Sequence, residues 1–98
     1  HDLLVLPAVA IAAMPLDAPL PKEIAGREIR DHLDMMVPTF AFNLSPHPAI
    51  SVPCGWTENG LAVGLQIVGG WRQDALVIRA AAAFEAVAPW TGRRPVLN

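Results

Sequence analysis

The stretch AISVPCGWTENGLAVGLQIVG, residues 49–69, decides how this chain folds. Residues 49–53 are a short apolar run that ends in a proline, and residues 61–68 are a second run in which large and small side chains alternate. The pair Asn59-Gly60 lies between them, and both residue types tolerate the positive φ angles that tight hairpin turns require. The stretch therefore predicts two antiparallel strands joined by a two-residue turn.

The second predicted strand carries apolar side chains on both of its faces. Successive side chains along a strand point to opposite faces of the sheet. Because neither face of this strand is mainly polar, we expect helices on both sides of the sheet. One face carries Leu61, Val63, Leu65 and Ile67, and the other carries Ala62, Gly64, Gln66 and Val68.

The residues after the hairpin predict a helix. Gly69-Gly70 end the strand, and the carboxylate of Asp74 suits the positive end of a helix dipole. No helix breaker occurs from residue 75 to residue 88, and Pro89 then ends the helix. Four consecutive alanines allow this helix to approach a sheet closely. The expected apolar stripe consists of Val77, Ala80, Ala81, Phe84 and Val87.

The first half of the chain predicts one more strand and one broken helix. Residues 3–6 are a continuous apolar run closed by Pro7, which suits a strand buried on both faces. Prolines make residues 8–22 a crossing loop, and residues 23–29 suit a small extended turn around a glycine. Apolar residues recur at helical spacing over residues 31–44, where Pro38 must kink or split the helix.

These elements predict the α/β class, with a partial mixed sheet and flanking helices in one segment, residues 1–98. The strands are too few for a self-sufficient sheet. Only 16% of the 98 residues are charged against 53% hydrophobic, whereas an ordinary domain carries about 25% charged residues. We therefore expect the chain to bury much of its surface, against a partner or as a piece of something larger.

Composition also excludes several classes of function. The net charge is −2 and the seven basic residues are scattered, so nucleic-acid binding has no electrostatic basis. The uncharged run over residues 3–16 is interrupted by prolines and is shorter than the ~20 residues that span a bilayer, so no membrane segment is expected. A single cysteine fits a reducing compartment, and we expect a cytoplasmic protein.

The residues themselves point to no confident catalytic group. Cys54 with His32, His47 and Asp34 provides the residue types for nucleophilic catalysis, so a Cys54-dependent hydrolase stays open as an alternative. Free cysteine is, however, usually buried, and we interpret Cys54 as a structural thiol. Lys22, the only lysine, is expected in a solvated loop. Paired ligand spacing is lacking, so neither a metal site nor a cofactor is predicted.

Residues 43–55 (NLSPHPAISVPCG) and 60–69 (GLAVGLQIVG), followed by a helix that contains Phe84-Glu85, resemble the C-terminal part of the amidase signature family. That family includes bacterial amidases and the A subunit of glutamyl-tRNA amidotransferase. The likeness runs from Asp2 to about Pro95. It implies that the chain is the C-terminal portion of the amidase signature fold, in which helices flank a large mixed sheet.

The resemblance also implies a mechanism whose residues lie elsewhere. The family uses a serine nucleophile, a second serine in a cis peptide and a lysine base, which come from a strand lysine and a Gly/Ser-rich stretch upstream. This chain has no such stretch, and Lys22 does not occupy the position of the family's lysine. No catalytic residue is therefore carried over.

One binding segment is implied by the resemblance. The loop Pro7, Ala8, Val9 and Ala10 resembles a stretch that borders the acyl-binding pocket in the family, and these four are the expected substrate-binding residues. All four are apolar here, which favours an uncharged acyl group because a charged one finds no partner.

Two positions depart from the family pattern. Met36 stands where the amidotransferase branch has an aspartate, although Asp34 is close enough for a small gap to place it there; this disfavours a glutamine-using enzyme. Ser45-Pro46 replaces the family's usual Thr-Gly and stiffens that turn.

The sequence thus predicts a C-terminal fragment of an amide-hydrolysing enzyme that supplies core strands and part of the acyl pocket. Alone it is expected to be inactive, and either to bind the missing N-terminal part of the enzyme or to self-associate into an oligomer. The alternative is a naturally short, non-catalytic α/β interaction module derived from an amidase.

Overall fold

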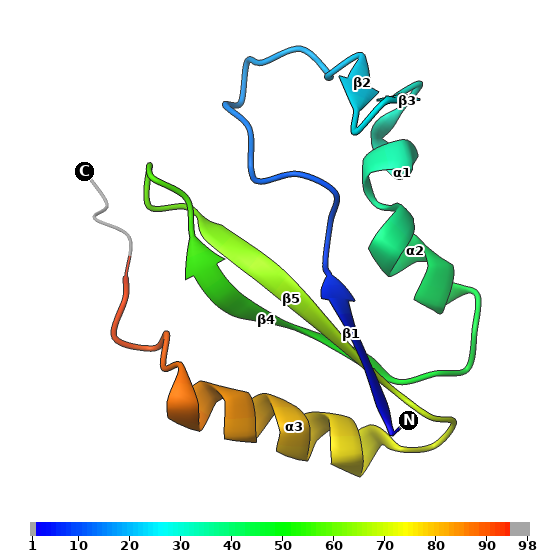
Figure 1. Cartoon of the computed structure of the whole chain (residues 1–98), viewed down its shortest axis with the longest axis vertical. Helices are drawn as coiled ribbons and strands as arrows, with labels where there is room; N and C mark the ends of the chain where they lie inside the picture. Colours follow the sequence, from blue (N-terminus) through cyan, green and yellow to red (C-terminus); the bar gives the residue numbers. More distant parts are fainter. Residues whose placement is uncertain (1, 95–98) are drawn as a thin grey trace.

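A three-stranded sheet organises the chain. In the computed structural model, which describes residues 2–94, the strands β1 (Leu3–Pro7), β5 (Ala62–Gly69) and β4 (Ala49–Trp56) lie in the order β1-β5-β4 (Figure 1). Both pairings are antiparallel, with Val5 opposite Ile67 and Ile67 opposite Ile50. The helices lie beside this sheet, and the predicted α/β class is confirmed.

The helix α3 (Asp74–Val87) covers one face of the sheet. Val52, Ile67 and Ala81 form the centre of the core between them. The small Ala81 and the bare backbone of Gly69 allow helix and strand to approach closely, as the run of alanines predicted. Around this centre pack Leu3, Ile50, Leu65, Ala80, Phe84 and Trp90.

The predicted apolar stripe of α3 is correct except at its last position. Val77 and Ala81 are buried, whereas the side chain of Val87 is 81% exposed. Val87 is the last residue of the helix, and beyond it the chain folds back so that the Trp90 ring lies 6.3 Å from the Phe84 ring. Trp90 therefore covers this end of the core in place of Val87.

The β4–β5 hairpin forms as predicted, but its turn is of another type. Gly60 has φ +78°, whereas Asn59 does not have a positive φ. The Gly60 N–H donates to the Thr57 carbonyl at 2.9 Å, and the Thr57 N–H donates to the Leu61 carbonyl at 2.9 Å. The turn therefore spans residues 57–60 and has one left-handed glycine as its last residue, so the prediction of two positive φ angles was wrong.

The strand β4 contains an irregularity at Cys54. The register between β4 and β5 shifts between Pro53 and Gly55, so Cys54 is the extra residue of a β-bulge. Its side chain is exposed, which contradicts the predicted buried thiol. The bulge turns the cysteine away from the core because it interrupts the alternation of side chains along the strand.

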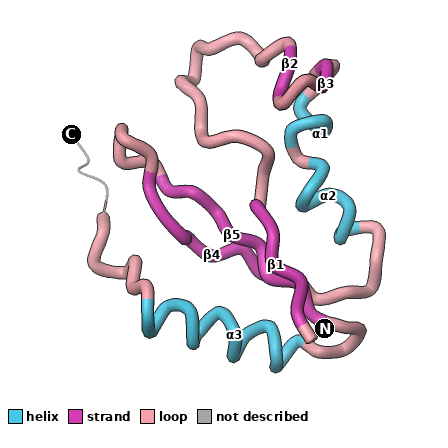
Figure 2. Tube along the Cα trace, in the orientation of Figure 1, coloured by secondary structure: helices cyan, strands magenta, loops and turns pink. Residues whose placement is uncertain are grey.

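On the opposite side of the sheet from α3 lie two short helices, α1 (His32–Met35) and α2 (Val37–Asn43) (Figure 2). They are one predicted helix that splits at Met36, just before Pro38, as the proline indicated. The buried Gln66 side chain donates from Nε2 to the Pro38 carbonyl at 2.9 Å and so ties α2 to β5. Helical structure on both sides of the sheet is thereby confirmed.

The segment between β1 and α1 is a long loop that ends in a small hairpin. No helix or strand occurs over residues 8–22, as predicted, and β2 (Glu23–Ile24) then pairs with β3 (Arg27–Glu28). Ala25 and Gly26 form the turn with φ +50° and +78°. The two consecutive positive φ angles expected at Asn59-Gly60 therefore occur here.

Candidate acyl-binding cavity

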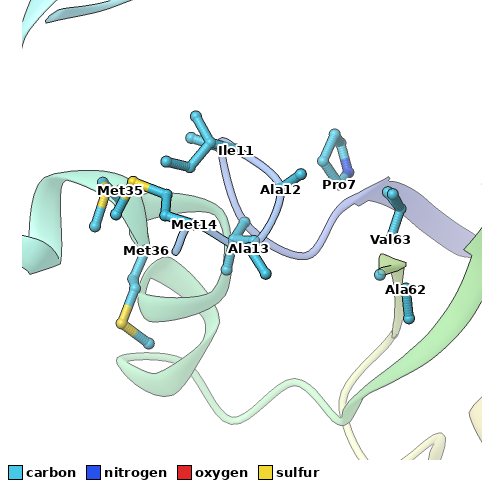
Figure 3. A pocket seen from close by; sticks show the side chains of 12 residues that line it. Pro7, Ile11, Ala12, Ala13, Met14, Met35, Met36, Ala62 and Val63 are labelled. Atoms are coloured by element: carbon cyan, nitrogen blue, oxygen red, sulfur yellow. The ribbon is translucent and has the colours of Figure 1, made fainter. Parts of the chain in front are cut away.

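An apolar cavity of about 530 Å³ lies between the loop that follows β1, the helix pair and the start of β5. In Figure 3, Met35 and Met36 lie on one side, Pro7 and Val63 lie on the other, and Ile11 lies between them. Every lining residue is non-polar. They are Pro7, Val9, Ala10, Ile11, Ala12, Ala13, Met14, Met35, Met36, Ala62, Val63 and Gly64.

Backbone hydrogen bonds hold the loop in place along this cavity. The Ala8 N–H donates to the Gly64 carbonyl at 3.0 Å, which extends the β1–β5 pairing by one residue. The Ala10 N–H donates to the Met35 carbonyl at 3.0 Å, and the Thr39 hydroxyl donates to the Ala8 carbonyl. The loop therefore spans from the sheet to both short helices, and the cavity lies beside that span.

The structure brings three of the four expected substrate-binding residues to this cavity. Pro7, Val9 and Ala10 line it, whereas Ala8 is buried behind them. A Cβ atom on Gly64 would lie 2.9 Å from the Ala8 Cβ, so Ala8 occupies the space that a side chain at position 64 would need. Ala8 thus supports the cavity wall from behind.

The methionines of the cavity were not anticipated from the sequence. Met14, Met35 and Met36 come from two segments, and their flexible, polarizable side chains adapt to apolar groups of different shapes. Met36 was noted for its place in the predicted helix and at the position of the amidotransferase aspartate, and Met35 was not noted. Their position beside the loop depends on the hydrogen bond from the Ala10 N–H to the Met35 carbonyl, which the sequence does not reveal. The only sequence signal was an apolar loop with few polar residues to cover it.

The lining of the cavity offers apolar contacts and no side chain that could transfer a proton. None of its lining side chains carries a titratable group, a hydroxyl or an amide. An uncharged acyl or alkyl group can exchange water for apolar contacts there, whereas a carboxylate or an ammonium group finds no partner.

The other candidate residues are dispersed. No hydrogen bond joins Cys54 to a histidine in the part of the chain that the structure describes. The His47 Nδ1 lies 3.1 Å from the Ser45 hydroxyl, and His32 is an exposed residue at the start of α1. Lys22 is exposed, and its carbonyl accepts a hydrogen bond from Ile29 at the base of the small hairpin. Within residues 2–94 no group of three potential metal ligands occurs.

Asp34 forms an ion pair that the sequence did not reveal. The Arg30 Nε and Nη2 atoms both donate to its carboxylate at 3.1 Å, and the Arg30 backbone N–H donates at 2.9 Å. These side-chain and backbone hydrogen bonds lower the pKa of Asp34 to about 2. Asp31 caps α1 through hydrogen bonds from Leu33 and Asp34. Both carboxylates therefore serve local structure, and neither lines the apolar cavity.

The chain has an α/β fold with an apolar cavity beside its sheet. Comparison with known proteins identifies its family. The chain belongs to the amidase family, whose model, described as Amidase, matches residues 1–78. The chain is 44% identical over 95 residues to an acylamidase from Rhodococcus erythropolis. It is 37% identical over 102 residues to a 6-aminohexanoate-cyclic-dimer hydrolase from Paenarthrobacter ureafaciens.

A solved structure agrees with this assignment. A bacterial aryl acylamidase described as belonging to the amidase signature enzymes superposes with a TM-score of 0.79 at 36% sequence identity. The match covers 97% of this chain and 21% of the solved chain. This chain likewise spans only about a fifth of the two curated relatives, 20% of the acylamidase and 21% of the hydrolase.

Among the described residues no helix is both long and apolar enough to cross a membrane.

Proposed function

We propose that this chain is part of an enzyme that hydrolyses carboxylic amides with an uncharged, apolar acyl group. In this proposal the chain supplies core strands and one wall of the acyl pocket, and the serine and lysine groups that cleave the amide come from the rest of the enzyme. The chain acts when joined to that remainder or bound to it. Its single cysteine suits a reducing compartment, so the proposal places the enzyme in the cytoplasm.

The apolar cavity is the observation that carries this proposal. Three of the residues expected to border the acyl group line it, and all of its other lining side chains are apolar. The names of the acylamidase and of the aryl acylamidase indicate that these two relatives act on acyl amides, which supports an amide as the substrate.

A chimera tests the proposal directly. The 98-residue chain replaces the matching segment of the Rhodococcus erythropolis acylamidase, and hydrolysis of a neutral aryl acylamide is followed by release of the amine. We expect the chimera to hydrolyse the amide and the 98-residue chain alone to be inactive. A folded chimera without activity, or an active isolated chain, would contradict the proposal.

A pair of loop variants tests the role of the cavity. Ala10→Asp places a carboxylate in the cavity wall, and we expect KM for the neutral acylamide to rise about tenfold, or about 1.4 kcal/mol, since an apolar acyl group that binds beside the carboxylate removes part of its hydration without offering it a partner. Leu16→Asp is the matched control, because Leu16 lies in the same loop, is fully exposed and does not line the cavity. Equal KM values for the two chimeras would refute binding of the acyl group at this wall.

A further inference from the structure

Two hydrogen bonds hold the loop that follows β1 beside the helix pair. The Thr39 hydroxyl donates to the Ala8 carbonyl, and the Ala10 N–H donates to the Met35 carbonyl at 3.0 Å. The two loop groups lie on either side of Val9, whose side chain lines the apolar cavity. The cavity wall is therefore fixed to the helices at the residue before Val9 and at the residue after it.

The loop makes few other hydrogen bonds along the cavity. Over residues 8–14, the only further one in the part of the chain that the structure describes joins the Ala8 N–H to the Gly64 carbonyl in β5. Residues 11–14 line the cavity, and within residues 2–94 none of them takes part in a hydrogen bond. The order of this wall therefore depends on the bonds at Ala8 and Ala10.

The Thr39 hydroxyl bonds outside its own helix. In a helix, a threonine hydroxyl commonly donates to the carbonyl three or four residues earlier in the chain. The carbonyl four residues before Thr39 is that of Met35, which accepts from the loop, and the hydroxyl bonds to a residue 31 positions away. Thr39 is partly buried there, and Ala8 is buried. This bond therefore secures the loop and not the helix.

The turn of α2 that carries Thr39 is itself attached to the sheet. Among the described residues, Gln66 is the one buried polar side chain, and its Nε2 donates to the carbonyl of Pro38, the neighbour of Thr39, at 2.9 Å. A buried amide without a partner is destabilising, so this contact fixes α2 against β5. The hydrogen bonds thus connect the sheet to the cavity wall through the first turn of α2.

We propose that Thr39 is a positioning residue: its hydroxyl holds the loop wall of the cavity in place, and the enzyme thereby favours large apolar acyl groups over small ones. This inference rests on the proposed function in one respect, that the cavity binds the acyl group. The cavity volume of about 530 Å³ lies in the range of about 300–1,000 Å³ that accommodates drug-sized ligands. A large acyl group contacts much of such a wall and an acetyl group contacts little, so displacement of the wall weakens binding of the large group selectively.

A comparison of two substrates in the acylamidase chimera tests the inference. The para-nitroanilides of acetic acid and of cyclohexanecarboxylic acid release the same amine and differ only in the acyl group. Thr39→Val keeps the shape of the side chain and removes the hydroxyl. We expect KM for the larger amide to rise about tenfold with kcat unchanged, and both constants for the acetyl amide to stay within about twofold. Equal changes for both amides, or no change for either, would overturn the inference.

Two variants serve as matched controls. Thr39→Ser keeps the hydroxyl and should retain the preference for the larger amide. Thr57→Val removes the hydroxyl that accepts from the Leu61 N–H at 3.1 Å in the β4–β5 turn, away from the cavity lining, and should leave both KM values unchanged. A Thr39→Ser variant that behaves like Thr39→Val, or the same selective loss in Thr57→Val, would contradict the inference. If Thr39→Val does not fold, Thr39→Ala compared with Thr39→Ser tests the same hydroxyl.

Amide hydrogen exchange separates this inference from the proposed function. The exchange rate of the Ala10 N–H is measured in the 98-residue chain, where no activity is required. Thr39→Val should accelerate this exchange about tenfold or more, because the bond to Met35 then opens more often, and Thr57→Val should not. Unchanged exchange at Ala10 would overturn the positioning role even in an active chimera. An inactive chimera together with faster exchange at Ala10 in Thr39→Val would refute only the proposed function.

Discussion

The contact between Gly69 and α3 provides the sharpest test of how this chain is packed. Gly69 is a buried residue at the end of β5 without a positive φ, so close approach and not backbone conformation requires glycine there. A Cβ atom at this position would lie 2.6 Å from the Val77 Cγ2 and 3.3 Å from the Gln73 Cβ. Val77 is buried and β-branched, so its side chain has one strongly preferred rotamer in the helix and cannot turn away.

Gly69→Ala is therefore expected to push α3 away from the sheet. Overpacking of this kind costs about 1–3 kcal/mol of unfolding free energy. In a chain of this size each kcal/mol lowers Tm by roughly 4–8 °C. Urea and thermal unfolding followed by circular dichroism measure both quantities. Gly92→Ala is the control, because a Cβ atom there meets no neighbour within 4 Å, and its stability should be unchanged.

A double-mutant cycle identifies Val77 as the cause. Val77→Ala alone removes two buried methyl groups and costs about 2 kcal/mol. In Gly69→Ala/Val77→Ala the new methyl group occupies part of the space left by the valine, so the double variant should be at least about 1 kcal/mol more stable than additivity predicts. Strict additivity, or a Gly69→Ala variant as stable as Gly92→Ala, would refute the close approach of α3 to β5.

Two further predictions concern the segment before α2. Ala25→Asn should stabilise the protein by about 1 kcal/mol, because Ala25 has φ +50° and Asn followed by Gly26 suits such a turn; an unchanged urea midpoint would contradict this. Arg30→Gln should raise the pKa of Asp34 from about 2 toward 3.8, as measured by carboxyl NMR titration. Since the folded-state pKa is lowered, the ion pair stabilises the protein above pH 4, and this contribution is lost as the pH falls toward 2; a pKa that stays near 2 in the variant would refute the role of the guanidinium.

The pattern of residues in the sequence predicted the structure correctly where the structure depends on residues that are close together in the chain. The β4–β5 hairpin, the start of α3 at Asp74 and the split of the helix near Pro38 all form as predicted. Each depends on residues within a few positions of one another, through alternation of side chains, a breaker or a missing N–H. The apolar character of residues 7–10 likewise agrees with the apolar cavity that Pro7, Val9 and Ala10 line.

Other predictions failed where the outcome depends on hydrogen bonds or packing that the pattern does not specify. Asn59-Gly60 is compatible with more than one turn, and the Thr57 hydrogen bonds select the turn with a single positive φ. Cys54 is exposed because a register shift relative to β5 places it in a bulge. Val87 has the spacing of a core residue, but Trp90 covers that end of the core.

The sequence by itself determined the α/β class and the order of most elements. It also carried the motifs by which the chain is identified as a member of the amidase family. Only the tertiary structure decided which residues surround the cavity, because Met35 meets the loop at Ala10 through a contact 25 positions away in the chain. It also decided the order and register of the strands, which place β5 between β1 and β4 and bring Val5 and Ile50 to opposite sides of Ile67. Spacing in a sequence specifies faces and turns, whereas cavities and edges arise from the pairing of distant segments.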